Sequence, residues 1–114
     1  MSSPERQDGM DKPMDFESTF QSAVKEGITN TLGAIVMSSL QNLLKHPLKT
    51  YAEKPSELHH DLSRIFGSAS ITLERMITKE LFQRLDLHYS AELDFETSIN
   101  LASRDLMLNH RRIN

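Results

Sequence analysis

The stretch Lys54–Leu87 most constrains the fold, because it has the pattern of two amphipathic helices joined at a single glycine. Pro55 suits a first helical turn, since it has no N–H to lose there, and Ser56 is an alternative start. Gly67 follows the last apolar residue of the first helix, where a residue without Cβ can end the helix in a left-handed conformation. With so short a joint, we expect the second helix to fold back on the first or to cross it steeply.

Each of these helices has one apolar face at the spacing of an α-helix. The first face comprises Leu58, Leu62, Ile65 and Phe66. The second face comprises Leu73, Ile77, Leu81 and Leu85, widened by Ala69, Met76 and Phe82. Asp61 and Arg64 lie outside the first stripe, and Ser68 and Ser70 are both candidate N-caps of the second helix.

The rest of the chain predicts an all-α fold, a small bundle of four to five amphipathic helices with a disordered N-terminal tail. A length of 114 residues fits one domain. Residues 1–15 are polar, contain two prolines and show no apolar period, which is typical of a disordered tail. Residues 16–110 are expected to form the single helical domain, since no segment alternates with period two long enough to predict a strand.

Phe16–Leu32 is the first predicted helix, with Asp15 as its N-cap. Gly27 lies on its apolar face and costs helix stability relative to alanine, so we expect it to allow close approach of another helix. Gly33 either ends this helix or kinks it. Whether residues 16–45 form one kinked helix or two is left open by the pattern.

The segment Ala34–Lys45 continues the helical spacing, and Pro47 ends it. Its predicted apolar face comprises Val36, Leu40, Leu43 and Leu44, with Ile35 and Met37 beside it. Leu48–Lys54 is expected to be a connector, with Leu48 and Tyr51 tucked against the core.

Glu92–Leu108 is predicted as the last helix, with its apolar row at positions 95, 99, 102 and 106. Leu101, Met107 and Leu108 fall outside that row, so this helix has more than one apolar side. These three residues are a candidate partner or homodimer surface, and a helix wedged between two others would explain them equally well.

Glu74 is the candidate partly buried carboxylate, because it lies at the edge of the second apolar stripe. A catalytic acid or base would use such a group. We favour a hydrogen bond to a neighbouring helix terminus, since no second catalytic group accompanies Glu74.

Other chemistry has little support in the sequence. The chain has no cysteine, which removes disulfides and thiolate chemistry. Its five histidines form neither HxxxH nor HExxH, so we expect solvent-facing side chains and neither a metal nor a cofactor. They are His46, His59, His60, His88 and His110. No GxSxG elbow or GxGxxG loop is present, and we expect no catalytic residues and no enzyme activity.

Charge and hydropathy bear on location and partners. The net charge of −3 gives no basic field for nucleic acid, and no apolar run approaches the length of a membrane span. The polar N-terminus has no apolar core of a signal peptide, so we expect a cytoplasmic protein without membrane contact.

The central pattern resembles a small archaeal helical family, the nitrosopumilus output domain, type five, over roughly residues 20–87. The residues that carry it are Lys54, Pro55, Leu58, Leu62, Ile65, Phe66, Gly67, Ala69, Leu73, Glu74, Ile77 and Leu81. The resemblance implies a helical cytoplasmic output or interaction domain in archaeal signalling, with no catalytic residues. The chain departs from the family around Lys45–Ala52, and Glu92–Asn114 lies outside the resemblance.

Two functions follow from these patterns. The leading prediction is a non-enzymatic interaction domain that associates with itself through a helix face. The alternative is a nucleic-acid-binding regulator with a helix-turn-helix-like pair at residues 55–87 and Ser70–Leu85 as its reading helix. Glu74 and Glu80 on that helix, and the negative net charge, weigh against the alternative.

Overall fold

The computed structural model describes the backbone of residues 15–113 and the side chains of residues 15–106. This range is helical and contains no strand, which confirms the predicted small all-α bundle. The predicted disordered tail, residues 1–15, lies outside the described residues apart from Asp15. Among residues 15–113, no helix combines the length and the hydropathy that crossing a bilayer requires.

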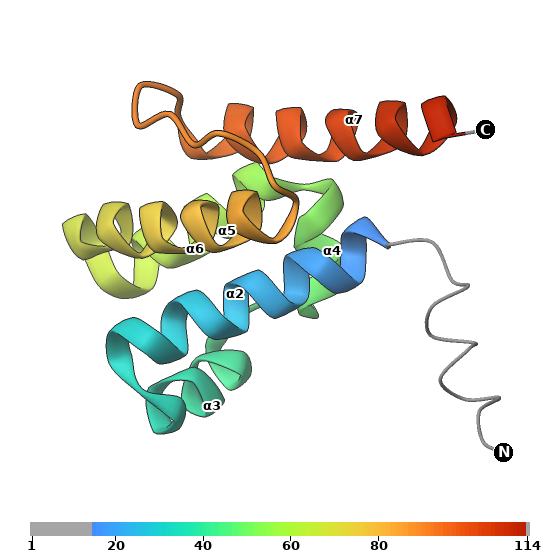
Figure 1. Ribbon diagram of the computed structural model, residues 1–114. Coiled ribbons are helices and arrows are strands. Elements are labelled where there is room, and N and C mark those ends of the chain that lie inside the picture. Colours follow the sequence, from blue (N-terminus) through green and yellow to red (C-terminus); the bar gives the residue numbers. More distant parts are fainter. Residues whose placement is uncertain (1–14, 114) are drawn as a thin grey trace, which may run out of the picture.

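The helices form three layers around one core (Figure 1). Their bounds are α2 Phe16–Leu32, α3 Ala34–Leu43, α4 Leu48–Glu53, α5 Pro55–Phe66, a 3-10 turn Gly67–Ala69, α6 Ser70–Arg84 and α7 Phe95–Ile113. In Figure 1, α7 covers the top, α5 and α6 form the middle, and α2 with α3 lies below. The middle helix α6 contacts α2, α5 and α7, so it is the centre of the bundle.

Helices α2 and α6 approach each other closely at Gly27. A Cβ built on Gly27 would lie 3.1 Å from both Cα and N of Ile77, which is tighter than ordinary packing. Only hydrogen fits between the two backbones, and this explains a glycine within a helix, where it weakens the helix itself. Asp15 begins α2 as predicted, since its carboxylate accepts a hydrogen bond from the backbone N–H of Glu17.

Gly33 separates α2 from α3 and resolves the open question, because residues 16–45 form two helices. Its φ of 99° lies in the region that favours glycine, and its N–H closes α2 on the carbonyl oxygen of Thr29. The chain therefore turns, and α3 packs back along α2.

The predicted apolar face of α3 is wrong at two of its four residues, Val36 and Leu43. Met37, Leu40 and Leu44 are buried, whereas Val36 and Leu43 are exposed. Residues 34–44 are apolar on more than one side and carry no charge, so no charged face marks the solvent side in the sequence.

The predicted connector is a short helix, α4, which begins after Pro47. Helix α3 ends at Leu43, two residues before the predicted Lys45. Pro47 disfavours helical geometry at His46 while allowing a new turn to start after it. Leu48 and Tyr51 are buried as expected, because both side chains lie on the inner side of α4.

The α5–α6 pair folds back into an antiparallel hairpin (Figure 1). Pro55 occupies the first turn of α5, and Gly67 ends it at a φ of 63°. The two predicted serine caps are wrong, because the N-cap position of α6 is Ala69 and no side chain caps it. Ser70 instead is buried, with its hydroxyl 3.4 Å from that of Ser63. Ala69, predicted to widen the apolar face, is exposed in the 3-10 turn.

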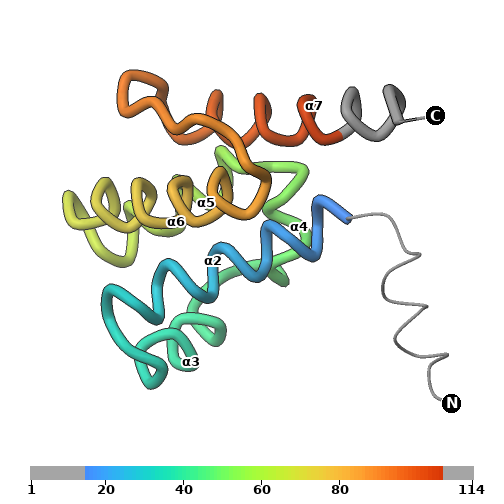
Figure 2. The backbone as a smooth tube through the Cα atoms, in the orientation of Figure 1, coloured from blue at the N-terminus to red at the C-terminus, as the bar shows by residue number. Residues whose placement is uncertain are grey.

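The last helix begins three residues later than predicted, at Phe95 in place of Glu92. Asp94 caps it, since its carboxylate accepts a hydrogen bond from the N–H of Thr97 at 2.8 Å. The segment 85–94 runs back along α6, so that α7 runs in the same direction as α6 (Figure 2). Tyr89 holds this segment against Phe82, with ring centroids 6.1 Å apart.

Candidate functional site

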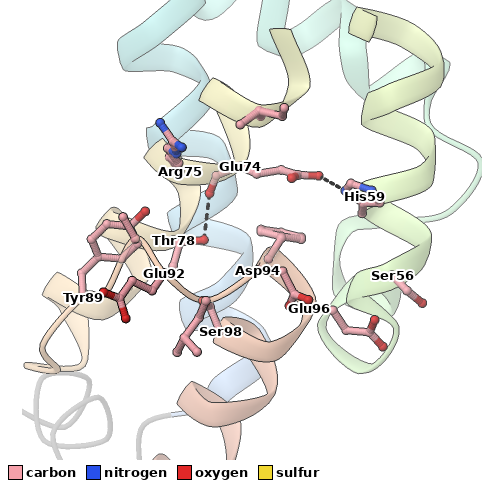
Figure 3. A pocket seen from close by; sticks show the side chains of 14 residues that line it. Ser56, His59, Glu74, Arg75, Thr78, Tyr89, Glu92, Asp94, Glu96 and Ser98 are labelled. Atoms are coloured by element: carbon pink, nitrogen blue, oxygen red, sulfur yellow. Dashed lines mark hydrogen bonds and ion pairs between the residues drawn. The ribbon is translucent and has the colours of Figure 1, made fainter. Parts of the chain in front are cut away.

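Two features of the surface are candidates for function: an open cleft beside α6 and an apolar face on α3. The cleft has a volume of about 490 Å³ and lies between α5, α6, the segment 85–94 and the start of α7. Figure 3 shows its polar side chains, with Glu74 and His59 on one side and Asp94 and Glu96 on the other. The cleft therefore collects groups from four parts of the chain.

Glu74 lies in this cleft and is only 7% exposed. Its Oε2 lies 2.5 Å from Nδ1 of His59, a side chain of α5 (Figure 3). The partner we favoured from the sequence was a helix terminus, and in the structure it is a histidine side chain from the facing helix. Sequence patterns missed this because the two residues are distant in the chain and meet only through the fold of the hairpin.

Burial raises the pKa of the Glu74 carboxyl, because the charged form loses water. The contact with His59 opposes this rise, and the negative charge of Asp94 adds to it. The pKa of Asp94 itself is lowered, first by the hydrogen bond from the backbone N–H of Thr97. The cleft thus holds one carboxyl that resists ionisation and one that ionises readily.

A carboxylate–histidine pair can orient an imidazole as a general base. Catalysis of acyl transfer would also need a nucleophile within hydrogen-bond reach of the free ring nitrogen. Among the side chains that the structure describes, the hydrogen-bond partner of His59 is Glu74. The pair joins α5 to α6, and within this range His59 has no hydrogen-bonded nucleophile beside it.

Two of the described histidines, His46 and His59, each contact one carboxylate. His46 Nε2 lies 3.2 Å from Glu57 Oε1, in a contact that is open to solvent on both sides. Within residues 15–106, no group of three or more histidine, aspartate or glutamate side chains is arranged to hold a metal ion. A metal site with the usual ligand number has no basis in this part of the chain.

A second polar pair, Tyr51 with Asp61, lies inside the bundle and was also missed by the sequence patterns. The hydroxyl of Tyr51 donates to Asp61 Oδ2 at 2.5 Å and accepts from the backbone N–H of His46 at 3.2 Å. Burial, followed by the hydrogen bond to Asp61, raises the pKa of Tyr51 to about 12. Burial alone would raise the pKa of Asp61, but the hydrogen bonds from Tyr51 and Arg64 outweigh it and lower that pKa.

This pair joins α4 to α5 inside the bundle, where both side chains are buried. Asp61 was placed outside the apolar stripe of its helix, yet it is buried because Tyr51 gives its carboxylate a partner.

The predicted partner surface on α7 can be followed only in part. Leu101 is 41% exposed, whereas the side chains of Met107 and Leu108 lie outside the described residues. The inner side of α7 packs on α5 and α6, with Phe95, Ile99 and Ala102 buried there. Of the three residues predicted for this surface, the structure describes the side chain of Leu101, which by itself is a small apolar area.

The largest exposed apolar side chains gather on and beside α3. We define the α3 face as Leu32, Ile35, Val36, Ser39 and Leu43, all of which are exposed. Ile35 is 82% exposed and Leu43 is 56% exposed, and exposed apolar side chains that are grouped in this way, unlike scattered ones, are typical of an interaction surface. The sequence does carry a signal for this face, since Gly27–Leu44 is the longest stretch without a charged or histidine residue.

Comparison with known proteins gives no relative whose function could be carried over. The α3 face and the cleft are therefore the features of this chain that bear on its function. No protein-family model matches the chain, and no curated protein or solved structure is significantly similar to it.

Proposed function

We propose that this protein is a non-enzymatic helical interaction domain that associates with a second copy of itself through the α3 face. The observation that carries the proposal is the exposure of Ile35 and Leu43 on a helix that has its main contacts with α2 alone. Moving apolar side chains out of water is favourable by about 25 cal/mol per Å² of apolar surface that is buried. A partner that covers the α3 face would recover this free energy.

The size of α3 sets the strength that we expect. A helix of ten residues is about 15 Å long, so the contact is smaller than the interfaces of permanent dimers. We therefore expect a reversible dimer with a dissociation constant in the micromolar range, about 10⁻⁶–10⁻⁴ M. Such an association responds to protein concentration, which suits an output domain.

The resemblance to the nitrosopumilus output domain, type five, extends the proposal to a cytoplasmic role in archaeal signal transduction. It is supported by the sequence pattern of the α5–α6 hairpin, in which Pro55 begins α5 and Gly67 follows its last residue. The gene neighbourhood would test this part, since a signalling role predicts neighbouring receiver or sensor genes.

The nucleic-acid alternative has less support. Its reading helix would be α6, which is surrounded by α2, α5 and α7 and has seven buried residues. A recognition helix needs a free face to enter the major groove. The α5–α6 pair is also an antiparallel hairpin, whereas a helix-turn-helix places its helices at about 90–120°.

Sedimentation equilibrium over a range of concentrations tests the proposal. We expect the apparent mass of the native chain to rise with concentration and Ile35→Glu to remove this rise. The matched control is Ile71→Glu, because Ile71 is 51% exposed on α6 at the cleft and away from α3. A chain that stays monomeric at high micromolar concentration would refute self-association, and equal loss in both variants would refute the role of α3.

A further inference from the structure

Within the α3 face, the row Ile35, Ser39 and Leu43 is symmetric about Ser39. Ile35 lies four residues before Ser39 and Leu43 four residues after it, so the two apolar side chains are about 6 Å away along the axis in opposite directions. At about 100° per residue they also lie about 40° to either side of Ser39 around the helix. The face is thus a small centre flanked by two large apolar side chains.

We infer that two copies of this chain pair through antiparallel α3 helices related by a two-fold axis beside Ser39. The inference rests on the proposed self-association and names its geometry. A two-fold axis brings the same patch of both copies together, so a patch that is symmetric about one residue matches itself. In this arrangement Ile35 of each copy packs near Leu43 of the other, and the two Ser39 residues meet at the centre.

The small side chain of Ser39 allows the pairing. Packed helices approach to 8–10 Å between their axes, and the distance depends on the side chains at the contact. A large residue in place of Ser39 would hold the helices apart and leave Ile35 and Leu43 without neighbours. The hydroxyl at the centre can donate to its counterpart, which avoids an unpaired polar group.

Charge also favours a second copy over a charged partner. A face that meets itself brings like charges together wherever it carries any, and such contacts cost free energy. Gly27–Leu44 carries no charged residue, so the α3 face meets its copy without repulsion. A charged partner would find no complementary group on this face.

The absence of cysteine makes a direct test possible, because a single introduced thiol reports on one site only. Two Cα atoms must come within about 7 Å to form a disulfide, and residues at the centre of a close two-fold helix pair meet this requirement. The test variant is Ser39→Cys. Gln41→Cys is the matched control, since it is exposed on the same helix but turned away from the α3 face.

We expect Ser39→Cys to form a disulfide-linked dimer under mild oxidation on the order of tenfold faster than Gln41→Cys, because the paired state raises the effective thiol concentration. Leu101→Cys, on α7, tests the other candidate surface. Fast linkage of Leu101→Cys with slow linkage of Ser39→Cys would overturn the α3 pairing while self-association stands.

A second outcome would also overturn the antiparallel pairing alone. In it, the native chain dimerises in sedimentation, but Ser39→Cys forms the disulfide no faster than Gln41→Cys. Slow linkage of all three variants together with a monomeric native chain would refute the proposed function itself. The two failures are therefore distinguishable.

Discussion

The helices α6 and α3 both pack against α2, yet they differ in how much of their apolar surface is buried. In α6 the stripe Leu73, Ile77 and Leu81 is at most 2% exposed, because three helices surround it. In α3 only one side faces α2, and a second apolar side with Ile35 and Leu43 faces outward. The number of neighbouring helices, and not the apolar content of the helix, decides how much of it is buried.

The difference assigns different roles to the two helices. Burial of the stripe Leu73, Ile77 and Leu81 makes α6 a main source of stability in the bundle, since removing apolar area from water is the dominant favourable term. The outer side of α3 adds little stability to the monomer and stays available for association. We expect substitutions in α6 to affect folding, and substitutions on the α3 face to affect assembly.

The same substitution in both helices tests this comparison most strongly. Ile77→Ala should lower the free energy of unfolding by about 2–5 kcal/mol, because Ile77 is fully buried. Ile35→Ala should lower it by less than about 0.5 kcal/mol, because its side chain is mostly in water. Urea denaturation at a protein concentration low enough to keep the chain monomeric measures both.

A third variant tests a solvent-accessible residue of α6 itself. Arg84 lies in the last turn of α6 and pairs with Glu80 at 3.3 Å in a solvent-accessible contact. Arg84→Ala should cost less than about 1 kcal/mol. Equal denaturation midpoints for Ile77→Ala and Ile35→Ala would show that the two helices do not differ as proposed.

Much of the α5–α6 hairpin could be predicted from the sequence. Pro55 and Gly67 act through their own backbone chemistry, which needs no partner, and so they mark the ends of α5. The apolar stripe of α6 was also visible, because charged residues occupy the remaining surface and leave one side for the core. Local signals are sufficient where backbone geometry and charge both point to the same face.

The pairs His59–Glu74 and Tyr51–Asp61 could not be predicted, because each depends on two helices meeting in space. The face of α3 was missed for another reason. Its sequence has apolar residues on two sides and no charge, so the period of the pattern left more than one orientation open. The side with Met37 and Leu40 is the buried one, because α3 packs against α2 there.

The contact between α2 and α6 gives a second, smaller test. Gly27→Ala should gain about 1 kcal/mol of helix propensity, yet its new methyl group would lie 3.1 Å from backbone atoms of Ile77. Backbone atoms cannot move aside without moving α6, and overpacking of this kind costs about 1–3 kcal/mol. We expect a net loss of about 1 kcal/mol in the free energy of unfolding.

Ser39→Ala is the matched control, since it also exchanges a small residue for alanine but on the exposed side of α3. There the substitution has room and should leave the stability of the monomer unchanged or slightly raised. A stabilising effect of Gly27→Ala would contradict the close α2–α6 approach.

The smallest effect concerns pH, where α6 and α3 again differ because α3 has no titratable side chain. The pKa of Glu74 is raised in the folded chain, so between its ordinary and its raised pKa the folded state holds a proton that the unfolded state has released. The contribution of Glu74 to the free energy of unfolding is therefore complete below the ordinary pKa and is lost as the pH rises through the raised pKa.

Glutamine does not titrate, so the free energy of unfolding of the native chain minus that of Glu74→Gln should decrease across this window. Urea denaturation of both proteins at a series of pH values measures the difference, while sedimentation at the same pH values should show an unchanged dimer. A difference that stays constant or increases with pH would contradict the burial of this carboxyl as the cause of its raised pKa.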